Sequence, residues 1–539
     1  MIRSLWLWVS VSYCSAFIGC QSNTTDLKAD RLERPNILIA ISDDQSYPHA
    51  GAYGDNMVHT PAFDRIAEDG ILFHNAFAAA PSCSPSRSSL LTGRYLWQNE
   101  EAGMLQALFP KKFVTFPDVL ENDGYHIGYT GKGAAPFNID ASGRDRNPAG
   151  PAYNEIRYVE SDDDRWASAI NPNNYAANFE AFLSDRSDGQ PFYFFFGASE
   201  PHRSYEKGSG LRSGKRLEDV NVPGFYPDRE EIRSDMLDYA LEVDWFDHHL
   251  MEMILKLEEI GELDNTLIFV TSDQGMPFPR AKTNLYDYGL RVPLAISWPD
   301  RITTGREVFD LISLADIAPT LIEITDVDPD PMLPMSATSF TNILFSDQSG
   351  FIDPSREMVF AGLEMHSSAR WAHLGYPKRS IRTYDFLYIH NFTPERWPAG
   401  APQTLSRDNP NELYYMHGLD ENGKFTGEAY FDIDASPTKS FLIENMDDPD
   451  VRKYFELAVA KRPGEELYDV NADPYNIVNL ADDPAYAGQL EELRENLFDF
   501  LRETEDPRVV GPVYDVFENY QRFNILRPFP KPDWVNTGE

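Results

Sequence analysis

Four short apolar runs constrain the fold of this chain more than any other feature of its sequence. They are residues 36–42, 125–130, 192–197 and 266–272. Each run is apolar at nearly every position and does not alternate with polar residues, so each is predicted to be a strand buried on both faces of a sheet. Before the last run, apolar residues recur three and four positions apart from Met236 to Ile260, which predicts a helix closed by Gly261. Helices that alternate with buried strands indicate an α/β fold with a largely parallel sheet.

Polar residues follow these strands or the loops after them. They are Asp43, Asp44, Lys132, His202, Asp273 and Gln274. Ligands of open α/β sheets bind beyond the carboxyl ends of the strands, so we expect these side chains to converge. Apart from the lysine and the histidine, the set consists of three carboxylates and one amide oxygen. Such an all-oxygen set suits calcium or magnesium and not zinc, although an isolated Asp-Asp pair could instead cap a helix or form a turn.

A cysteine, Cys83, begins a segment that predicts a helix with an anion site at its amino end. The segment reads Cys83-Ser84-Pro85-Ser86-Arg87. Ser84 can cap the helix, Pro85 suits its first position, and Gly93 can end it. Arg87 lies one turn beyond Cys83, so its guanidinium can reach the same place, and a helix amino terminus beside an arginine binds anions. An ordinary buried cysteine in a helix cap is the alternative.

With the continuation Leu91-Thr92-Gly93-Arg94, this segment resembles the signature of the sulfatase family. The resemblance implies that a formylglycine-generating enzyme oxidises Cys83 and that hydrated formylglycine is the nucleophile. The two acidic pairs resemble the metal ligands of the family, to which residue 83 also belongs, but Gln274 stands where asparagine or histidine is usual. Three further segments carry the resemblance: Gly131-Lys132-Gly133, Pro201-His202-Arg203 and Arg280-Ala281-Lys282.

Within the family, the motifs are most similar to those of the heparan N-sulfatase (sulfamidase) branch. The segments concerned include residues 82–87, 201–203, 273–279 and 283–286. Two residues depart from the pattern: Ala134 replaces the histidine expected after the sulfate-binding lysine, and Glu200 replaces an aspartate. In relatives that histidine breaks down the covalent sulfate intermediate, so the group with this role is open here.

The resemblance implies the fold of the alkaline-phosphatase-like superfamily. We expect a catalytic α/β domain at 34–375 and a smaller C-terminal domain at 376–539, with an antiparallel sheet and a helix at 484–504 whose leucines form a stripe. Segment 365–382 lies near the predicted boundary and either closes over the pocket or is an ordinary interdomain loop. Candidate substrate-binding residues are Arg203, His366, Arg370 and Arg379.

The resemblance also assigns roles in the reaction. Arg87, Lys132 and Lys282, with the metal, would bind the sulfate oxygens in the transition state. The metal would lower the pKa of one formylglycine hydroxyl. His202, or Lys282 beside it, would protonate the departing sugar oxygen. The second hydroxyl would then allow sulfate to leave and the aldehyde to re-form.

The amino terminus predicts export. Residues 1–19 carry one early positive charge and an apolar run too short for a comfortable membrane span, as in a signal peptide. The preceding Phe17-Ile18-Gly19 resembles a bacterial lipobox, so we expect Cys20 to be acylated and residues 20–33 to form a polar tether. The predicted product is a periplasmic or outer-membrane-anchored bacterial lipoprotein that meets the membrane only through its lipid. Cleavage to a free periplasmic enzyme is the alternative.

The net charge of −39 and pI of about 4.6 exclude general nucleic-acid binding, which requires a basic face. An anionic substrate must therefore be held by a local cluster of cations. The favoured function is hydrolysis of sulfate esters at the ends of sulfated oligosaccharides, from marine algal polysaccharide such as ulvan or from glycosaminoglycan. Three alternatives stay open: N-sulfoglucosamine sulfohydrolase (sulfamidase) activity, phosphodiesterase or phosphonate hydrolase activity, and glycan binding by an inactive relative.

Overall fold

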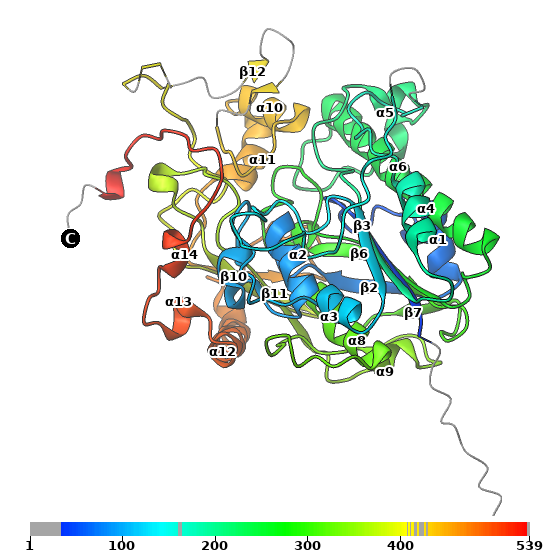
Figure 1. Ribbon diagram of the computed structural model, residues 1–539. Coiled ribbons are helices and arrows are strands. Elements are labelled where there is room, and N and C mark those ends of the chain that lie inside the picture. The colour runs from blue at the N-terminus through cyan, green and yellow to red at the C-terminus, as the bar shows by residue number, and fades with distance from the viewer. Residues whose placement is uncertain are drawn as a thin grey trace, which may run out of the picture. The chain divides into compact units, whose positions relative to one another are not determined.

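Eight strands form a mixed, mostly parallel sheet in the order β3-β4-β1-β5-β6-β2-β7, with β8 paired to β2 (Figure 1). The strands are β1 (Asn36–Ser42), β2 (Ile71–Phe77), β3 (His126–Gly131), β4 (Phe192–Gly197), β5 (Thr266–Ser272), β6 (Arg291–Ser297), β7 (Arg306–Val308) and β8 (Ile312–Ser313). Strand β1 pairs in parallel with β4 and β5, whereas β6 runs antiparallel to both of its neighbours, β5 and β2. The arrangement confirms the predicted α/β fold class. The computed structural model describes residues 34–159, 164–406, 408–409, 411–413, 418–419, 425–426 and 429–535.

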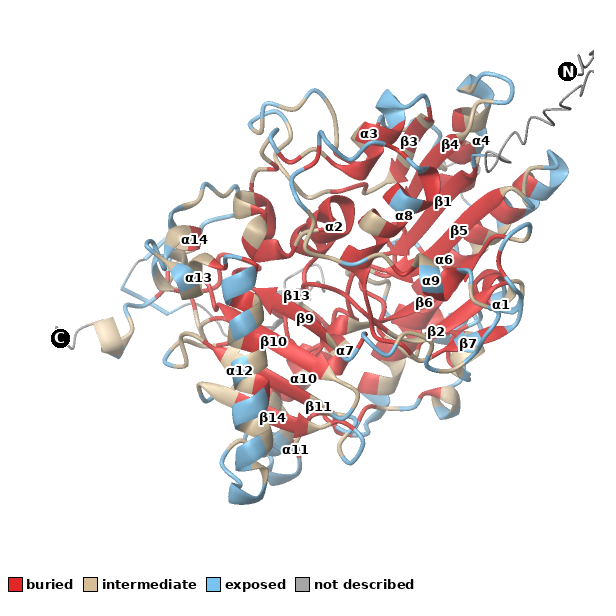
Figure 2. Ribbon diagram, turned by 90° about the horizontal axis from the view of Figure 1, so that it is seen from below, coloured by how far each residue is buried: buried red, intermediate tan, exposed pale blue. Residues whose placement is uncertain are grey.

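Helices cover both faces of this sheet, which is why its central strands are apolar at consecutive positions. In β1, Ile37, Ile39 and Ile41 join one core cluster, and Leu38 and Ala40 join another on the opposite face. Figure 2 shows these strands as buried throughout. The helices on the Leu38 face are α1 (Pro61–Glu68), α4 (Tyr175–Asp185) and α6 (Glu230–Glu259), and those on the Ile37 face are α2 (Cys83–Thr92), α3 (Phe116–Asn122) and α8 (Ile317–Thr325) (Figure 1).

The predicted elements around the sheet are present. Strands β1, β4 and β5 have the bounds of their apolar runs, and β3 is shifted by one residue, from 125–130 to His126–Gly131. The predicted long helix is α6, and its apolar stripe from Met236 to Leu257 is buried. Gly261 follows it with a φ of +70°, a left-handed conformation that glycine adopts without strain.

A second, antiparallel sheet has the order β14-β11-β10-β9. Its strands are β9 (Met358–Leu363), β10 (Lys378–Thr383), β11 (Phe386–Asn391) and β14 (Glu465–Asp469). Helix α12 (Ala487–Glu503) packs on this sheet through Leu493, Leu497 and Leu501, as the leucine stripe predicts. Strand β9 begins before residue 376, and residues Pro35–Glu539 form one compact unit. The division into two domains at 375/376 therefore stays a prediction.

The remaining elements include two short strands and seven helices. They are β12 (Gly418–Leu419), β13 (Phe425–Thr426), α5 (Ser209–Arg212), α7 (Asp287–Leu290), α9 (Thr341–Leu344), α10 (Pro437–Glu444), α11 (Pro449–Val459), α13 (Pro507–Val510) and α14 (Val516–Asn519). The predicted signal peptide, tether and acylated Cys20 fall in residues 1–33, outside the described residues. Among the helices that are described, none combines the length and the apolar character needed to cross a bilayer.

Candidate active site

Cys83 is the first residue of α2 and is buried, with 2 % of its surface exposed. Ser82 holds the N-cap position in an extended conformation. The prediction that Ser84 caps the helix is wrong, because its hydroxyl donates to a backbone carbonyl of a neighbouring loop (2.8 Å). Pro85 consequently lies inside the first turn, where its missing N–H does no harm because the N–H groups of that turn have no helical acceptor.

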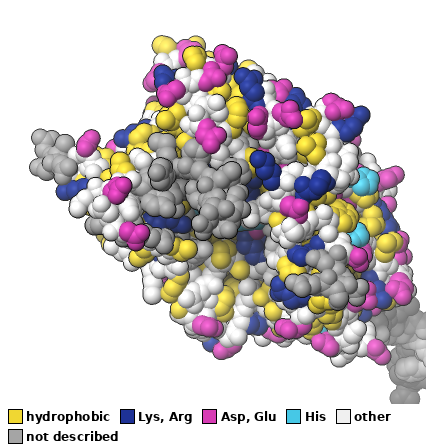
Figure 3. Space-filling view, turned by 90° about the horizontal axis from the view of Figure 1, so that it is seen from above, with side chains coloured by type: hydrophobic (Ala, Val, Ile, Leu, Met, Phe, Trp, Pro, Cys, Tyr) yellow, Lys and Arg dark blue, Asp and Glu magenta, His cyan; other side chains and the backbone are white. Residues whose placement is uncertain are grey.

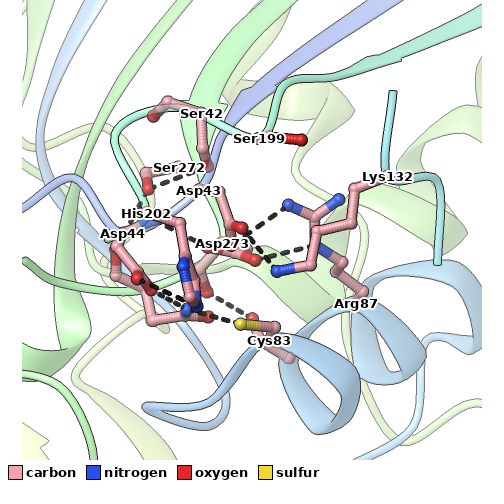
Figure 4. A network of polar contacts seen from close by, with 12 residues as sticks. Ser42, Asp43, Asp44, Cys83, Arg87, Lys132, Ser199, His202, Ser272 and Asp273 are labelled. Carbon is pink, nitrogen blue, oxygen red and sulfur yellow. Dashed lines mark hydrogen bonds and ion pairs between the residues drawn. The ribbon is translucent and has the colours of Figure 1, made fainter. Parts of the chain in front are cut away.

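Two cations, the buried Arg87 and the partly exposed Lys132, reach the carboxylates that follow β1 and β5 (Figure 4). The Arg87 guanidinium lies 2.7 Å from Oδ2 of Asp273 and 3.5 Å from Oδ1 of Asp43. The Lys132 ammonium bonds the other carboxylate oxygen of Asp43. Because these side chains come from α2, from the loop after β3 and from two strand ends, their pairing brings four distant segments of the chain to one point.

Lys282 and His202 complete the predicted catalytic set. Lys282 is 3 % exposed, and its Nζ lies 2.7 Å from Oδ2 of Asp44 and 3.3 Å from Oδ2 of Asp434. The Nε2 atom of His202 lies 3.9 Å from the same oxygen of Asp44. His202, Asp43 and Cys83 also bring one possible ligand atom each to within 4.8 Å of one another. The catalytic residues predicted from the sequence are thus gathered around Cys83.

The predicted metal ligands converge in the same place. Asp43, Asp44 and Asp273 bring carboxylate oxygens within 4.8 Å of one another, in full burial. Oε1 of Gln274 is buried without a hydrogen-bond partner among the described residues, while its amide nitrogen contacts Asp44 and donates to Sγ of Cys83 (3.1 Å). An orphaned amide oxygen beside clustered carboxylates fits a hard divalent cation, which these four oxygen-bearing residues would hold.

Burial makes ionisation of the clustered carboxylates unfavourable. Burial raises the pKa of Asp44 to about 6 and that of Asp273 to about 7, and the negative charge of Asp43 adds to both shifts. Burial opposes ionisation of Asp43 as well, but Lys132 and the other nearby cations hold its pKa well below the usual range. Ionising all three carboxylates is thus opposed by burial and by their mutual repulsion, and a bound cation would relieve both.

Cys83 and His202 are both neutral in this environment. Burial and the charge of Asp43 raise the pKa of the Cys83 thiol to about 12, so an unmodified thiol stays protonated at neutral pH. Burial, reinforced by Lys282, lowers the pKa of His202 to about 4. Nδ1 of His202 lies 2.6 Å from the carbonyl oxygen of Arg203, which can only accept, so Nδ1 carries the hydrogen and Nε2 is an acceptor. His202 must therefore gain a proton before it can donate one from Nε2.

Two of the four predicted substrate-binding residues lie at the edge of the cluster. Nδ1 of His366 lies 2.8 Å from the hydroxyl of Ser82, the residue before the cysteine. Nη2 of Arg370 donates to Asp432 (2.6 Å), which lies two residues before the Asp434 that contacts Lys282. We call the residues gathered around Cys83 the reactive cluster. His366 contacts the residue before Cys83, and Arg370 contacts a residue two positions from Asp434.

The other two candidates are occupied by ion pairs. Arg203 donates to both carboxylate oxygens of Asp235 (2.8 and 2.9 Å). Arg379 is fully buried, donates to Asp506 (2.7 Å) and contacts Glu364. Guanidinium groups held by buried carboxylates are typical of structural arginines, and breaking such a pair leaves an unpaired buried charge. The geometry does not favour substrate binding by Arg203 or Arg379, and their assignment stays a prediction.

Asp434 belongs to the cluster although sequence reasoning missed it. Lys282, His202 and His366 hold its pKa well below the usual range, against the effect of burial. It lies in an irregular segment before α10, far along the chain from the strands that carry the other residues. The signal available was weak: Asp432 and Asp434 are two positions apart, which places both on one side of an extended segment.

Ala134 stands where the resemblance predicts a histidine. It is fully buried in the core cluster on the Ile37 face of the sheet, and its N–H donates to the side chain of Asn147 (3.0 Å). This position therefore contributes packing and not a titratable group. Within the described structure, His202 and His366 are the imidazoles beside the start of α2.

The site combines three parts on one α/β fold: a buried cysteine at a helix start, cations that suit an anion, and carboxylates that suit a divalent metal. The family model described as Sulfatase matches residues 35–327, which is more than half of the chain. The chain belongs to the sulfatase family, and its activity is the hydrolysis of sulfuric esters. These results confirm the family and the enzyme class expected from the sequence.

Relatives and solved structures cover most of the chain. Human N-sulphoglucosamine sulphohydrolase is 28% identical, with 88% of this chain and 92% of the relative aligned. An ulvan-active sulfatase from Formosa agariphila is 27% identical, with 88% and 81% aligned. A structure of a protein in complex with its substrate D-glucosamine-2-N,6-O-disulfate matches with a TM-score of 0.58 at 19% identity, covering 88% of this chain and 99% of that chain. That structural similarity supports the fold, and the family generally uses formylglycine and a divalent metal.

Proposed function

We propose that this sulfatase acts on sulfated carbohydrates, with formylglycine at position 83 as its nucleophile and calcium as its metal. The observation that carries the proposal is the convergence at the start of α2 of three cations and three carboxylates. The cations are Arg87, Lys132 and Lys282, and the carboxylates are Asp43, Asp44 and Asp273. An anion site and a cation site that share one buried cysteine fit the transfer of a sulfate group to that residue.

The residues of this chain have separable roles. Arg87, Lys132 and Lys282 bind the sulfate oxygens and stabilise the charge that shifts onto them. The present partners of Lys132 and Lys282 are Asp43 and Asp44, which would also hold the divalent cation, so these two ammonium groups lie beside both sites. Hydrated formylglycine supplies one hydroxyl that attacks sulfur and a second that restores the aldehyde, and bound calcium supplies the Lewis acidity that lowers the pKa of the first.

The proton for the leaving oxygen comes from Lys282 or His202. Asp434 and Asp44 raise the pKa of Lys282 well above its usual value, against the effect of burial, so this ammonium is charged and close to the reactive residue. His202 carries its hydrogen on Nδ1 and becomes a donor at Nε2 only after protonation. Lys282 is therefore the group that already holds a proton in this state.

The oxygen-only ligand set fits both calcium and magnesium. Magnesium usually keeps several waters and uses only one or two carboxylates of the protein. Four buried side chains that offer oxygen together form a more complete cage, which is the pattern of calcium sites. This is the basis on which we assign calcium.

The substrate class follows from the relatives. Their names specify sulfated glucosamine in one case and ulvan in another. We propose that the preferred substrate carries O-sulfate on an oligosaccharide derived from algal polysaccharide or glycosaminoglycan. Cleavage of N-sulfate is the second candidate, which the 28% identity to human N-sulphoglucosamine sulphohydrolase over 88% of the chain favours.

Sulfate release from defined compounds tests this function. The panel contains N-sulfated and O-sulfated glucosamine oligosaccharides, ulvan oligosaccharides, a phosphodiester and a phosphonate ester. We expect sulfate release from at least one O-sulfated compound by the wild type and none by Cys83→Ala. Faster turnover of the phosphodiester or phosphonate would establish the alternative activity, and release from N-sulfated compounds alone would establish the second candidate. No turnover of any compound by protein that carries formylglycine and metal would contradict the proposal.

We also propose that the protein is exported as a lipoprotein and matured by a formylglycine-generating enzyme. The lipobox-like end of the apolar run before Cys20 and the Cys83 segment motivate this. Metabolic labelling with a fatty acid should mark the wild type and not Cys20→Ala. An unlabelled, fully exported wild type would instead establish the free periplasmic form.

A further inference from the structure

A pocket of about 220 Å³ lies beside the segment that leads away from the reactive cluster. Its walls combine three indole rings with three cationic side chains. These residues are Arg370, Trp371, Arg396, Trp397, Lys531 and Trp534. Among its described lining residues there is no Asp or Glu, although the whole chain carries a net charge of −39. Arg370 pairs with Asp432 and Arg396 pairs with Glu518, two acids that do not line the pocket. Aromatic walls with cationic side chains among them suit an anionic ligand with an apolar face.

The indole rings are half-buried and fixed in different orientations. The rings of Trp371 and Trp534 are perpendicular, with centroids 6.3 Å apart. The Arg396 guanidinium lies 6.0 Å from the centroid of Trp534. Outside the lining, the Lys461 ammonium lies 5.4 Å from the centroid of the Trp397 ring. The pocket therefore presents flat aromatic surfaces with positive charge beside them.

Arg370 distinguishes this pocket from an ordinary aromatic hollow. It is 4 % exposed, and its Nε and Nη2 donate to backbone carbonyls and to Asp432. Its third nitrogen, Nη1, is buried without a hydrogen-bond partner in the described part of the chain. A buried donor without a partner costs stability, and an anionic group in the pocket would satisfy it.

The pocket and the reactive cluster share two segments. Residues 366–371 run from the contact of His366 with Ser82 to the pocket wall at Trp371. Residues 432–434 run from the partner of Arg370 to the Asp434 that contacts Lys282. The pocket is therefore connected to the cluster around Cys83 through two short segments of the chain.

We propose that this pocket binds a second, anionic sugar residue of the substrate, beyond the residue whose sulfate is removed. This inference rests on the proposed action on sulfated carbohydrates. A pyranose ring has an apolar C–H face, which packs on an indole, and its sulfate or carboxylate group pairs with the cations at the rim. The pocket therefore makes the enzyme select oligosaccharides over single sulfated sugars.

The test compares two variants with a matched control on substrates of two lengths. Trp371→Ala removes an aromatic wall, and Lys531→Gln removes an exposed charge at the rim. Trp166→Ala is the control, because Trp166 is 46 % exposed and packs against Trp245, which does not line the pocket. The substrates are a heparin-derived and an ulvan-derived tetrasaccharide and a sulfated monosaccharide of each type.

We expect both pocket variants to raise KM for the tetrasaccharide about tenfold, with the larger effect from Trp371→Ala. Their kcat/KM on the monosaccharide and all rates of Trp166→Ala should stay within about twofold of wild type. An equal loss on both lengths, or no loss on either, would overturn the inference. Thermal unfolding checks that each variant is folded, and Lys531→Gln, at an exposed position, keeps the test valid if Trp371→Ala does not fold.

Failure of the proposed function gives a different result. If wild type releases no sulfate from any substrate, the proposed function is wrong, and calorimetry then tests the pocket alone. Tetrasaccharide binding to Cys83→Ala that is weakened about tenfold by the additional Trp371→Ala change would still support the pocket. Binding that the additional change does not alter, or no binding at all, would refute it.

Discussion

The Nζ atom of Lys282 lies 2.7 Å from Oδ2 of Asp44, so a predicted sulfate-binding cation contacts a predicted metal ligand. Both side chains are buried, and neither would be stable there as an isolated charge. The anion site and the metal site are therefore electrostatically dependent on each other. A substitution in the anion site should therefore change the affinity of the metal site for its cation.

The first prediction concerns Lys282. Lys282→Ala should reduce kcat/KM about 100-fold, because it removes one cation from the sulfate site and the charged proton donor beside it. It should also strengthen calcium binding, because Asp44 loses a competing partner. Kinetics and calcium titration by calorimetry check both effects, with exposed Lys207→Ala as the control. Calcium binding weakened by Lys282→Ala would contradict the dependence described above.

The second prediction concerns the metal. Removing divalent cations with a chelator should abolish activity, and calcium should restore it. Calcium should also raise the melting temperature of the wild type, because a ligand that binds only the folded state stabilises it. Asp43→Ala and Asp273→Ala should lose both responses, whereas Gln274→Asn should be milder because the ligand type is kept. Full activity in metal-stripped protein would show that the carboxylate cluster is not a catalytic metal site.

The third prediction concerns Cys83. Mass spectrometry of the peptide that contains it should find an aldehyde or its hydrate in active protein. Cys83→Ser should be inactive when purified from a host whose maturation enzyme acts on cysteine, although α2 keeps its sequence pattern. Substrate binding should survive in Cys83→Ala, since the cations remain. A plain thiol in fully active enzyme would refute the modification.

The fourth prediction concerns Glu200 and pH. Burial raises its pKa from 4.5 to about 7, while its oxygens accept from Tyr175 (2.7 Å) and from the N–H of Asn171 (2.7 Å). Between these values the folded state binds a proton that the unfolded state lacks, so the free energy of unfolding falls as the pH rises from about 4.5 to 7. Glu200→Gln removes this titration. As the pH rises from about 4.5 to 7, the free energy of unfolding of the variant minus that of wild type should therefore increase, by at most about 3 kcal/mol.

Urea unfolding at about pH 5 and about pH 8 measures this difference. Glu259→Gln, which removes a glutamate charge at a mostly exposed position, provides the matched control. A stability difference between Glu200→Gln and wild type that does not vary with pH would show that Glu200 is ionised in the folded protein at both values.

The fifth prediction is that the enzyme acts at the ends of short chains. With a net charge of −39, a long polyanion would be repelled outside the local cation cluster. Figure 3 shows Asp and Glu side chains interspersed with Lys and Arg on one face of the protein. Short oligosaccharides should lose terminal sulfate faster than intact polymer, and added salt should raise the rate on polymer by screening the repulsion. Comparable rates on polymer and on short fragments, independent of salt, would contradict an end-acting pocket.

The sequence was sufficient for the elements that local physics determines. Apolar residues at consecutive positions occur where a strand is covered on both faces, and this located β1, β4 and β5 to the residue. The periodic apolar stripe of α6 marks the buried face of that helix. The glycines at 93 and 261 mark the ends of α2 and α6, because both adopt a left-handed backbone conformation there. Asp43, Asp44 and Asp273 could be placed together because residues after parallel strands meet at one edge of the sheet.

Only the tertiary structure decided which side chains are free to meet a ligand. Arg203 and Arg370 are both cationic in the sequence, but the guanidinium of Arg203 is paired with Asp235. Arg370, beside the aromatic pocket, has one nitrogen that finds no partner among the described residues. Asp434 contacts Lys282, and Trp534 lines the aromatic pocket, but the sequence around each residue does not predict these positions. Local pattern reports the environment of a strand or a helix, whereas the pairing of buried charges and the walls of a pocket depend on which distant segments pack together.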